Sequence, residues 1–330
     1  MNDFKIVLYN TEGTGTFIEE QVLQHRGLKN FKLIRISGNK DEEFLKEAAD
    51  ADGVSIVYFN MDETAMTKLA RCRIIAAQCI GVNNIDLPAA TRRGIFVSNV
   101  PDYCIEEVAV HTVGQILDCA RRITQLDRSV QAGVWDFESA GKIYRTKGKT
   151  YGLVAFGSIP RRVAELLKPF GMTLIAYDPF VSEEVFKTAG VERAESLEDL
   201  FSRCDYISVH TPLSPQTRHM IGEAQLSRIK PGAVLVCTGR GGVIDEAALK
   251  EALLSGTIAA AAMDVIEDEI HFTSELIGLK NVIITPHAAY YSEEALDEVR
   301  TKAMEQVISV LVDKKAPTYL VNKDIAVNPC

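Results

Sequence analysis

The chain has 330 residues, 47% of them hydrophobic and 25% charged, and its formal net charge at pH 7 is −9. This length predicts two domains, each large enough for its own core. The lysines and arginines form no basic stripe, so we expect no nucleic-acid partner. No apolar run is long enough to span a bilayer, so we expect no membrane segment.

The seven cysteines give an odd count, and no two have C-x-x-C spacing. This argues against a disulfide framework or a cysteine-rich zinc site, and we predict no bound metal. Most cysteines lie in apolar segments, where we expect small buried side chains. The first ten residues lack the charged-then-apolar layout of a signal peptide. These features favour a reducing, cytoplasmic location.

The first hundred residues alternate between predicted strands and helices. Short β-branched segments predict strands at 5–10, 31–37, 53–59, 73–78 and 95–100. Helical patterns lie between them, for example at 41–50 and 62–71. Such alternation predicts a parallel sheet with helices on both faces.

A helical pattern without proline then covers residues 105–132 and predicts one long helix that links or braces two domains. A second series of strands and helices follows, and an amphipathic helix is predicted within 293–315. The expected strands of the second series are 151–157, 173–179, 206–212, 233–239, 258–265 and 281–287. The fold class is therefore α/β with two doubly wound halves, in which ligands bind beyond the carboxyl ends of the strands.

The segment "YGLVAFGSIPRRVAELL" has the strand, turn and helix order of a dinucleotide fingerprint. Of the three fingerprint glycines only the middle one, Gly157, is present; Ala155 and Pro160 replace the others. Ser158 and Ile159 would offer backbone N–H groups to an anion at the helix start. Asp178 ends the next strand, where an acid accepts from ribose hydroxyls and favours NAD over NADP. A plain strand–helix crossover is the alternative.

Polar residues lie at the ends of four strands of the second series. His210 and Thr211 lie at the end of one, and Arg240 follows the next. The last two are followed by polar residues as well: Asp264, Glu267, Asp268 and Glu269 after one, and His287 after the other. Each alone is compatible with a surface turn, solvated acids or a structural histidine. Together they suit reduction of a 2-keto acid, because arginine binds carboxylates in a bidentate manner and a histidine beside a carboxylate delivers protons near neutral pH.

Several motifs resemble the D-isomer-specific 2-hydroxyacid dehydrogenases, and the resemblance covers nearly the whole chain. The segments near Asp264 and His287 look closest to D-lactate dehydrogenases and to the C-terminal-binding-protein corepressors. The matching segments are "GVNNIDLPAA", "GIFVSNVPDY", "VAFGSIPRRVA", "HTPLSPQT", "TGRGGVIDEAAL", "AMDVIEDE" and "TPHAAYYSEEA".

The resemblance implies a flavodoxin-like substrate domain, 1–101 plus 299–330, and a Rossmann NAD-binding domain, 102–298. It also implies a site in the interdomain cleft and a homodimer formed partly through the long helix. Arg240 would bind the substrate carboxylate, His287 would donate the proton, and Glu269 would pair with His287. Glu267 is the nearest rival to Glu269.

The resemblance implies two further groups of site residues. The substrate would contact Ile80, Gly81, Val82, Tyr103 and Tyr290. NAD would contact Cys104, Thr112, Gly157, Ser158, Ile159, Asp178, Thr211, Pro212, Thr217, Thr238, Gly239, Arg240, Asp264 and His287. The chain departs from the family pattern at Ala155 and Pro160, at Val110 where glutamate is common, and at Cys104 where serine or threonine is common.

The sequence is compatible with three functions. The first is an NAD-dependent reductase of a small 2-keto acid, the second a non-catalytic NAD(H)-sensing scaffold like the corepressors, and the third a formate or phosphite dehydrogenase. The chain ends soon after its last predicted helix, with no long disordered tail for partners, which favours the enzyme. Tyr58 and Phe59 are candidates for an aromatic substrate pocket, but we expect them to be ordinary core residues.

Overall fold

The computed structural model describes residues 4–11 and 13–325. The chain divides into two compact units, 1–104 with 291–330, and 105–290. The first unit is thus discontinuous in sequence. The predicted boundary after residue 298 falls inside the last helix, α12 (Glu293–Leu311), which belongs whole to the first unit. No helix in the described ranges is long and apolar enough to cross a membrane.

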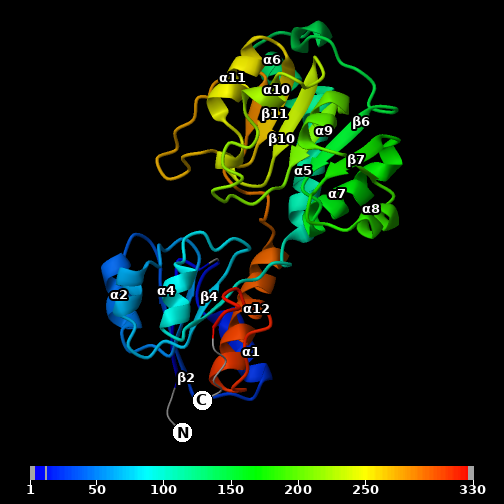
Figure 1. Ribbon diagram of the computed structural model, residues 1–330. Coiled ribbons are helices and arrows are strands. Elements are labelled where there is room, and N and C mark those ends of the chain that lie inside the picture. Colours follow the sequence, from blue (N-terminus) through cyan, green and yellow to red (C-terminus); the bar gives the residue numbers. More distant parts are fainter. Residues whose placement is uncertain (1–3, 12, 326–330) are drawn as a thin grey trace. The chain divides into compact units, whose positions relative to one another are not determined.

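Unit 1 is a five-stranded parallel sheet in the order β2-β1-β3-β4-β5, the flavodoxin-like order. The C-terminal helix α12, orange to red in Figure 1, packs against α1 at the other end of the sequence. The strands are β1 (Phe4–Tyr9), β2 (Phe31–Ile36), β3 (Gly53–Ile56), β4 (Ile74–Ala77) and β5 (Phe96–Ser98). The other helices are α1 (Phe17–His25), α2 (Asp41–Ala48), α3 (Glu63–Thr67) and α4 (Leu87–Arg92).

Unit 2 is a seven-stranded parallel sheet in the order β12-β11-β10-β9-β6-β7-β8. The first strand of this sheet in sequence is β6. Strands β7 and β8 follow on one side of it and β9 to β12 on the other, which is the arrangement of a doubly wound fold. The strands are β6 (Thr150–Val154), β7 (Thr173–Tyr177), β8 (Glu192–Arg193), β9 (Tyr206–Val209), β10 (Ala233–Cys237), β11 (Ile258–Met263) and β12 (Val282–Ile284). The two-residue strand β8 carries no apolar pattern and was not predicted.

Helices cover both faces of this sheet. They are α5 (Ile105–Arg121), α6 (Ile123–Gln131), α7 (Ser158–Leu167), α8 (Glu183–Ala189), α9 (Leu197–Arg203), α10 (Glu223–Leu226) and α11 (Glu246–Leu254). Short 3₁₀ turns lie at Phe137–Ala140, Lys168–Phe170 and Gly241–Val243.

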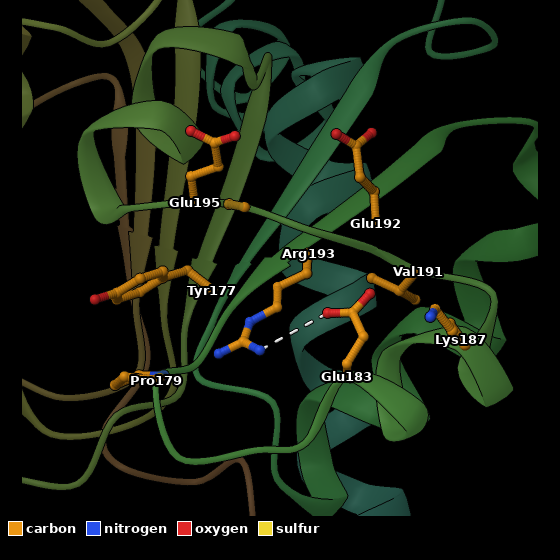
Figure 2. A pocket seen from close by; sticks show the side chains of 9 residues that line it. Tyr177, Pro179, Glu183, Lys187, Val191, Glu192, Arg193 and Glu195 are labelled. Atoms are coloured by element: carbon orange, nitrogen blue, oxygen red, sulfur yellow. Dashed lines mark ion pairs between the residues drawn. The ribbon is translucent and has the colours of Figure 1, made fainter.

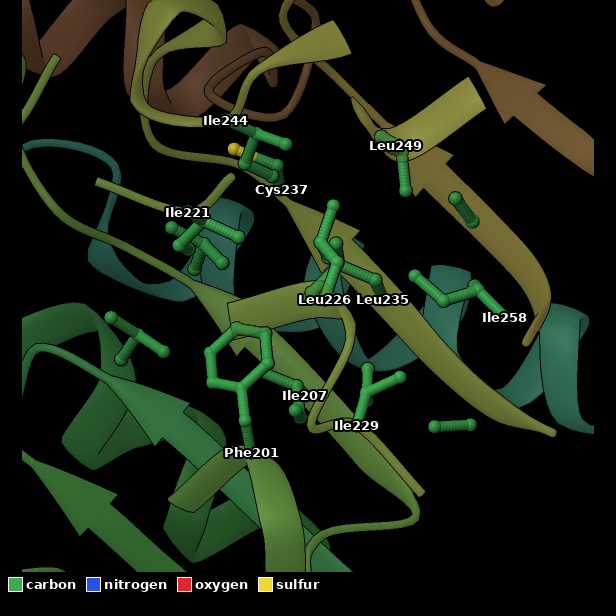
Figure 3. Packing of buried hydrophobic residues seen from close by; sticks show 14 of the residues in the cluster. Phe201, Ile207, Ile221, Leu226, Ile229, Leu235, Cys237, Ile244, Leu249 and Ile258 are labelled. Atoms are coloured by element: carbon green, nitrogen blue, oxygen red, sulfur yellow. The ribbon is translucent and has the colours of Figure 1, made fainter. Parts of the chain in front are cut away.

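The strand β10 explains why the central segments are continuously apolar. Leu235 and Cys237 pack into the core cluster shown in Figure 3, which is completed by helices α9 to α11. Val234 and Val236 belong to the second cluster, together with residues of α5 and α7. Because every side chain of such a strand is buried on one face or the other, the alternation of polar and apolar residues disappears.

The prediction of one helix over 105–132 is wrong. The helix breaks at Arg122, whose φ is +57° in the left-handed region. Asp118 stabilises the break, because its carboxylate accepts hydrogen bonds from the Thr124 backbone N–H (2.8 Å) and hydroxyl (2.5 Å). This side-chain capping starts a new helix without the proline or glycine that the sequence pattern would need.

The described cysteines are free, and five of the six are buried, as predicted. Burial raises the pKa of the thiols of Cys72, Cys119, Cys204 and Cys237 to about 12, so these thiols are protonated at neutral pH. Cys330 lies outside the described residues.

Candidate active site

The predicted catalytic residues lie beyond the carboxyl ends of three neighbouring strands of unit 2. Arg240 follows β10, Glu269 lies in the long loop after β11, and His287 follows β12. Because the strands are parallel and adjacent, all three loops leave the same edge of the sheet.

His287 and Glu269 form a direct pair. Nδ1 of His287 lies 2.8 Å from Oε2 of Glu269. A carboxylate accepts the proton of Nδ1, so Nε2 is the nitrogen left to face a substrate. The backbone of His287 is left-handed, with φ at +51°, a conformation that a non-glycine residue adopts only where its surroundings enforce it. The Tyr290 ring lies edge-on to the imidazole, with centroids 6.3 Å apart.

Glu267, the rival of Glu269, contacts a different histidine. Its Oε1 lies 3.0 Å from Nε2 of His219, and its Oε2 is 3.6 Å from the Arg218 guanidinium. Glu267 and Glu269, two residues apart in the chain, therefore have different histidine partners.

Buried Asp264, only 1% exposed, enforces the conformation of the His287 loop. Its carboxylate accepts hydrogen bonds from the backbone N–H groups of Ala288 and Ala289, both at 2.9 Å, and from the Thr285 hydroxyl at 2.6 Å. Its carbonyl oxygen accepts from the His287 N–H at 2.8 Å. Asp264 thus holds the segment on both sides of the candidate proton donor.

Two residues on α5 that the sequence did not single out complete this network. Nε2 of His111 and Nε2 of Gln115 each lie 3.1 Å from the Thr285 hydroxyl oxygen. That hydroxyl donates to Asp264, so hydrogen bonds connect helix α5 to the His287 loop through Thr285. The available signal was a polar pair four residues apart on an otherwise apolar helical face.

The Arg240 guanidinium donates to the Gly239 carbonyl oxygen at 2.8 Å. Among residues 4–11 and 13–325, no carboxylate lies within 4.0 Å of it. A guanidinium at the end of a buried strand that lacks a carboxylate partner is suited to bind one from a ligand.

The glycines around Arg240 serve the protein's own packing. A Cβ on Gly241 would lie 2.0 Å from the Ile266 carbonyl oxygen, and one on Gly239 would lie 2.9 Å from the Thr211 carbonyl oxygen. Neither glycine has a positive φ. Glycine is therefore required at these two positions because neighbouring loops approach closely, and not because the backbone is left-handed.

Several predicted cofactor residues form a chain of hydroxyl groups. The Thr112 hydroxyl donates to the Val108 carbonyl oxygen and lies 3.0 Å from the Thr238 hydroxyl, which is 3.3 Å from Nδ1 of His210. Burial lowers the pKa of His210 to about 3, so this ring is neutral at ordinary pH. After β9, Thr211 is buried, and the Thr217 hydroxyl donates to the Pro212 carbonyl oxygen at 2.7 Å.

The turn after β6 fits a dinucleotide. Gly157 is the N-cap residue of α7. A Cβ built on it would have no heavy atom within 4 Å, so a ligand can reach its backbone. The first N–H groups of α7, on Ser158 and Ile159, have no partner within the helix. Ala155 adopts φ at +73°, which explains why glycine is common at this place.

Asp178 ends β7 beside that turn. Its Oδ2 accepts from the Phe156 N–H at 2.8 Å and its Oδ1 from the Phe180 N–H at 2.9 Å. A carboxylate has about four acceptor positions, so two remain for ribose hydroxyls. Arg161 was not among the predicted cofactor residues. Its guanidinium donates to the Gly157 carbonyl oxygen at 3.0 Å and places a positive charge at the turn.

A pocket of about 690 Å³ adjoins the Asp178 turn at the ends of β7 and β8 (Figure 2). Its lining is strongly charged, and Arg193 lies 3.7 Å from Glu183 across it. None of the predicted site residues lines it; the lining consists of Tyr177, Pro179, Glu183, Lys187, Val191, Glu192, Arg193, Ala194 and Glu195.

The remaining candidates belong to unit 1. The segment Ile80–Val82 follows β4, and its shape is held by Asn99, which donates to the Ile80 carbonyl oxygen at 2.7 Å. Tyr103 and Cys104, the last two residues of the first segment of this unit, are buried. Phe59 packs in the core, as expected, but the expectation is wrong for Tyr58, which is 66% exposed after β3.

The fold and this edge of the sheet define a two-unit protein with a nucleotide-binding Rossmann unit. Comparison with known families agrees, since residues 113–289 match the model described as "D-isomer specific 2-hydroxyacid dehydrogenase, NAD binding domain". The chain belongs to the D-isomer specific 2-hydroxyacid dehydrogenases, a family of NAD-dependent oxidoreductases. Its cofactor is NAD.

Two curated relatives and one solved structure illustrate the similarity. The chain is 41% identical to a D-3-phosphoglycerate dehydrogenase of Methanocaldococcus jannaschii over 83% of its length, but spans only 52% of that protein. It is 38% identical to a glyoxylate reductase of Aeropyrum pernix, over 86% of this chain and 87% of that one. The apo-structure of D-lactate dehydrogenase from Escherichia coli superposes with a TM-score of 0.81 at 30% identity, covering 96% of this chain and all of the other.

Proposed function

We propose that this protein is an NAD-dependent dehydrogenase that reduces a small 2-keto acid to the D-2-hydroxy acid. The observation that carries the proposal is the His287–Glu269 pair at 2.8 Å, on the same sheet edge as Arg240. A carboxylate-binding guanidinium and a proton donor beside it are the two groups that a 2-keto acid requires from the protein.

Each residue has a role in this proposal. Arg240 binds the substrate carboxylate and polarises the ketone, so that negative charge developing on its oxygen is stabilised. Nε2 of His287 donates the proton to that oxygen. Glu269 orients the imidazole and balances its positive charge. Ile80, Gly81 and Val82 are proposed to hold the carboxylate through backbone N–H groups, with Tyr103 and Tyr290 beside the substrate.

NADH, when bound, supplies the hydride that reduces the substrate carbon. The chain's own part is to bind and orient it. Ser158 and Ile159 would bind the pyrophosphate and Asp178 the adenosine ribose, where its negative charge disfavours a 2′-phosphate. Thr112, Thr211, Pro212, Thr217, Thr238 and Gly239 are proposed to line the remainder of the cofactor site, with Asp264 near the nicotinamide amide and Cys104 beside it.

The test is NADH oxidation at 340 nm with pyruvate, 2-ketobutyrate, hydroxypyruvate, glyoxylate and phenylpyruvate. We expect turnover on at least one of them, reduced by about two to four orders of magnitude in His287→Gln, the usual contribution of a general acid. Arg240→Ala should mainly raise KM for the keto acid and lower kcat. His25→Gln, on α1 in unit 1, is the matched control and should leave turnover unchanged.

Absence of turnover on every keto acid, with NADH still bound, would instead support the scaffold function. That alternative is not favoured, because the relatives named above are dehydrogenases and reductases. The formate or phosphite alternative is tested by adding those two donors with NAD in the same assay.

We also propose that the protein is a homodimer. Helix α6 has no buried residue within the chain although it is amphipathic, and apolar side chains of the following segment are exposed too. The exposed apolar residues are Ile123 and Val130 in α6 and Val134, Trp135, Phe137 and Tyr144 in the following segment. Exposed apolar side chains that gather in one stretch of chain are stabilised by burial against a second copy of the chain.

The dimer has a convenient probe, because Trp135 is the only tryptophan and is 90% exposed in the chain. We expect light scattering to give the mass of two chains and Trp135 emission to shift to longer wavelength on dilution. Trp135→Asp should yield monomers, while Leu254→Asp, an equally apolar exposed position on α11, should remain dimeric. A monomeric wild type would refute the proposal.

The free cysteines of the described chain support a proposed reducing, cytoplasmic location.

A further inference from the structure

The loop that carries Glu269 is attached at both ends to one buried carboxylate. Glu246, the first residue of α11, is only 6% exposed. One of its oxygens accepts from the Glu267 backbone N–H at 2.7 Å, and the other accepts from the Ser274 hydroxyl at 2.5 Å. The two contacts hold residues 267 and 274 on the same Glu246 side chain. The segment 267–274 thus forms a ring, and we call the Glu246 end of it the base.

The tip of this ring is not held by apolar packing. Ile270 is 90% exposed and Phe272 is 66% exposed. Local hydrogen bonds of Asp268 shape the tip, since its carboxylate accepts from the His271 N–H and the Thr273 hydroxyl, both at 3.1 Å. These bonds fix the shape of the tip. The place of Glu269 on the protein depends on its pair with His287 and on the two contacts that Glu246 makes at the base of the ring.

The same base is joined to the Arg240 turn. The backbone of Gly241 lies so close to Ile266 and Glu267 that a Cβ there would be 2.0 Å from the Ile266 carbonyl oxygen. Glu246 follows this turn in the chain, and its carboxylate accepts the hydrogen bond from the N–H of the same Glu267. The turn bearing Arg240 and the loop bearing Glu269 are therefore packed and hydrogen-bonded as one piece.

We propose that Glu246 is a positioning residue, which holds Glu269 within reach of His287 and fixes the Glu269 loop relative to Arg240. Glu246 does not contact the substrate and acts through Glu269 alone. The kinetic part of this inference rests on the proposed function, whereas the structural part does not.

The structural part is tested by hydrogen exchange of the ligand-free protein. Glu246→Ala should speed exchange of the amides in 267–274 about tenfold or more, the order expected for losing hydrogen bonds to a charged group. Glu246→Gln should stay near wild type, because its amide can accept from the Glu267 N–H and donate to the Ser274 hydroxyl. Glu251→Ala, an exposed position on the same helix, is the control and should change nothing.

The kinetic part is tested by combining Glu246→Ala with Glu269→Gln. Glu246→Ala alone should lower kcat about tenfold with the KM for NADH unchanged, and the double variant should be no slower than Glu269→Gln alone, as for residues acting through one another. A general loss of folding would instead multiply the two effects and raise the KM for NADH.

Unchanged exchange in 267–274 in Glu246→Ala, or multiplicative losses of kcat, would overturn the inference. If Glu246→Ala does not fold, Ser274→Ala removes one of the two contacts. It also removes the acceptor of the Leu276 N–H, so the amides that test the inference are those of 271–273, which should exchange faster. If the wild type reduces no 2-keto acid while Glu246→Ala still frees the loop, the proposed function fails and the structural anchor stands.

Discussion

The two halves of the sheet edge in unit 2 are held in different ways. Beyond β10, β11 and β12, the buried carboxylates of Asp264 and Glu246 accept hydrogen bonds from the loops that carry His287 and Glu269. Beyond β6 and β7, Gly157 and Ser158 are exposed, and Asp178 is only partly buried.

The difference follows from what each half has to do. Groups that take part in proton transfer must be oriented before the substrate arrives, so the protein uses its own acceptors to fix them. Groups that bind a pyrophosphate must leave their N–H donors for the ligand. Four predictions test this contrast, and they follow in decreasing order of expected effect.

Asp264→Ala should lower the free energy of unfolding by about 2–5 kcal/mol, because the N–H groups of Ala288 and Ala289 and the Thr285 hydroxyl lose a buried acceptor. Asp178→Ala is the matched variant in the other half, since its carboxylate also accepts two backbone N–H groups. It should cost about 1 kcal/mol or less, because water can reach the freed donors. Urea unfolding measures both; equal losses would contradict the contrast between the two halves.

His210, at the end of β9 between the halves, should make stability depend on pH. Burial lowers its folded pKa to about 3, below the ordinary histidine value near 6.5. Between those values the unfolded chain binds a proton that the folded chain does not, so stability falls as pH decreases from about 6.5. At pH 5 the loss is about 1–2 kcal/mol. His210→Gln should remove this part of the slope in urea unfolding between pH 7 and pH 5, and an unaltered slope would show that other groups cause it.

Arg161→Ala should weaken NADH binding about tenfold, since one cation at the pyrophosphate turn is lost. Arg162→Ala is a control one residue away, because its guanidinium is already bound to Glu106 at 2.6 Å and Glu165 at 2.9 Å. Fluorescence titration of NADH gives both dissociation constants, at low and high salt. A similar weakening in both variants would mean that general charge, not the place of Arg161, is what matters.

Ala155→Gly should raise the free energy of unfolding by about 0.5–1 kcal/mol, because glycine removes the strain of a left-handed backbone but costs some chain entropy. Ala132→Gly, where φ is −83°, removes no strain and should only destabilise. Thermal unfolding compares the two. A loss of stability in Ala155→Gly would show that the turn is not strained in solution.

Much of the fold was predictable because its signals are local. The strands other than β8 were predicted from short apolar segments, and the doubly wound class followed from their alternation with helices. The predictions failed where a side chain far from any pattern intervened, as at Arg122, where Asp118 caps a new helix. They also failed at Tyr58, whose exposure depends on what packs around the end of β3 and not on its own residue type.

For the site, the residue type at each strand end could be read from the sequence: Arg240 after β10, the acids after β11 and His287 after β12. The order of residues along the chain is local information, and the pairing of Glu269 with His287 was expected only from the family resemblance. The contact of Glu267 with His219, and the way in which Asp264, Thr285 and Glu246 hold the loops, became visible only in the folded chain. Those contacts depend on distances of a few ångströms between residues far apart in sequence, which hydrophobic periodicity does not encode.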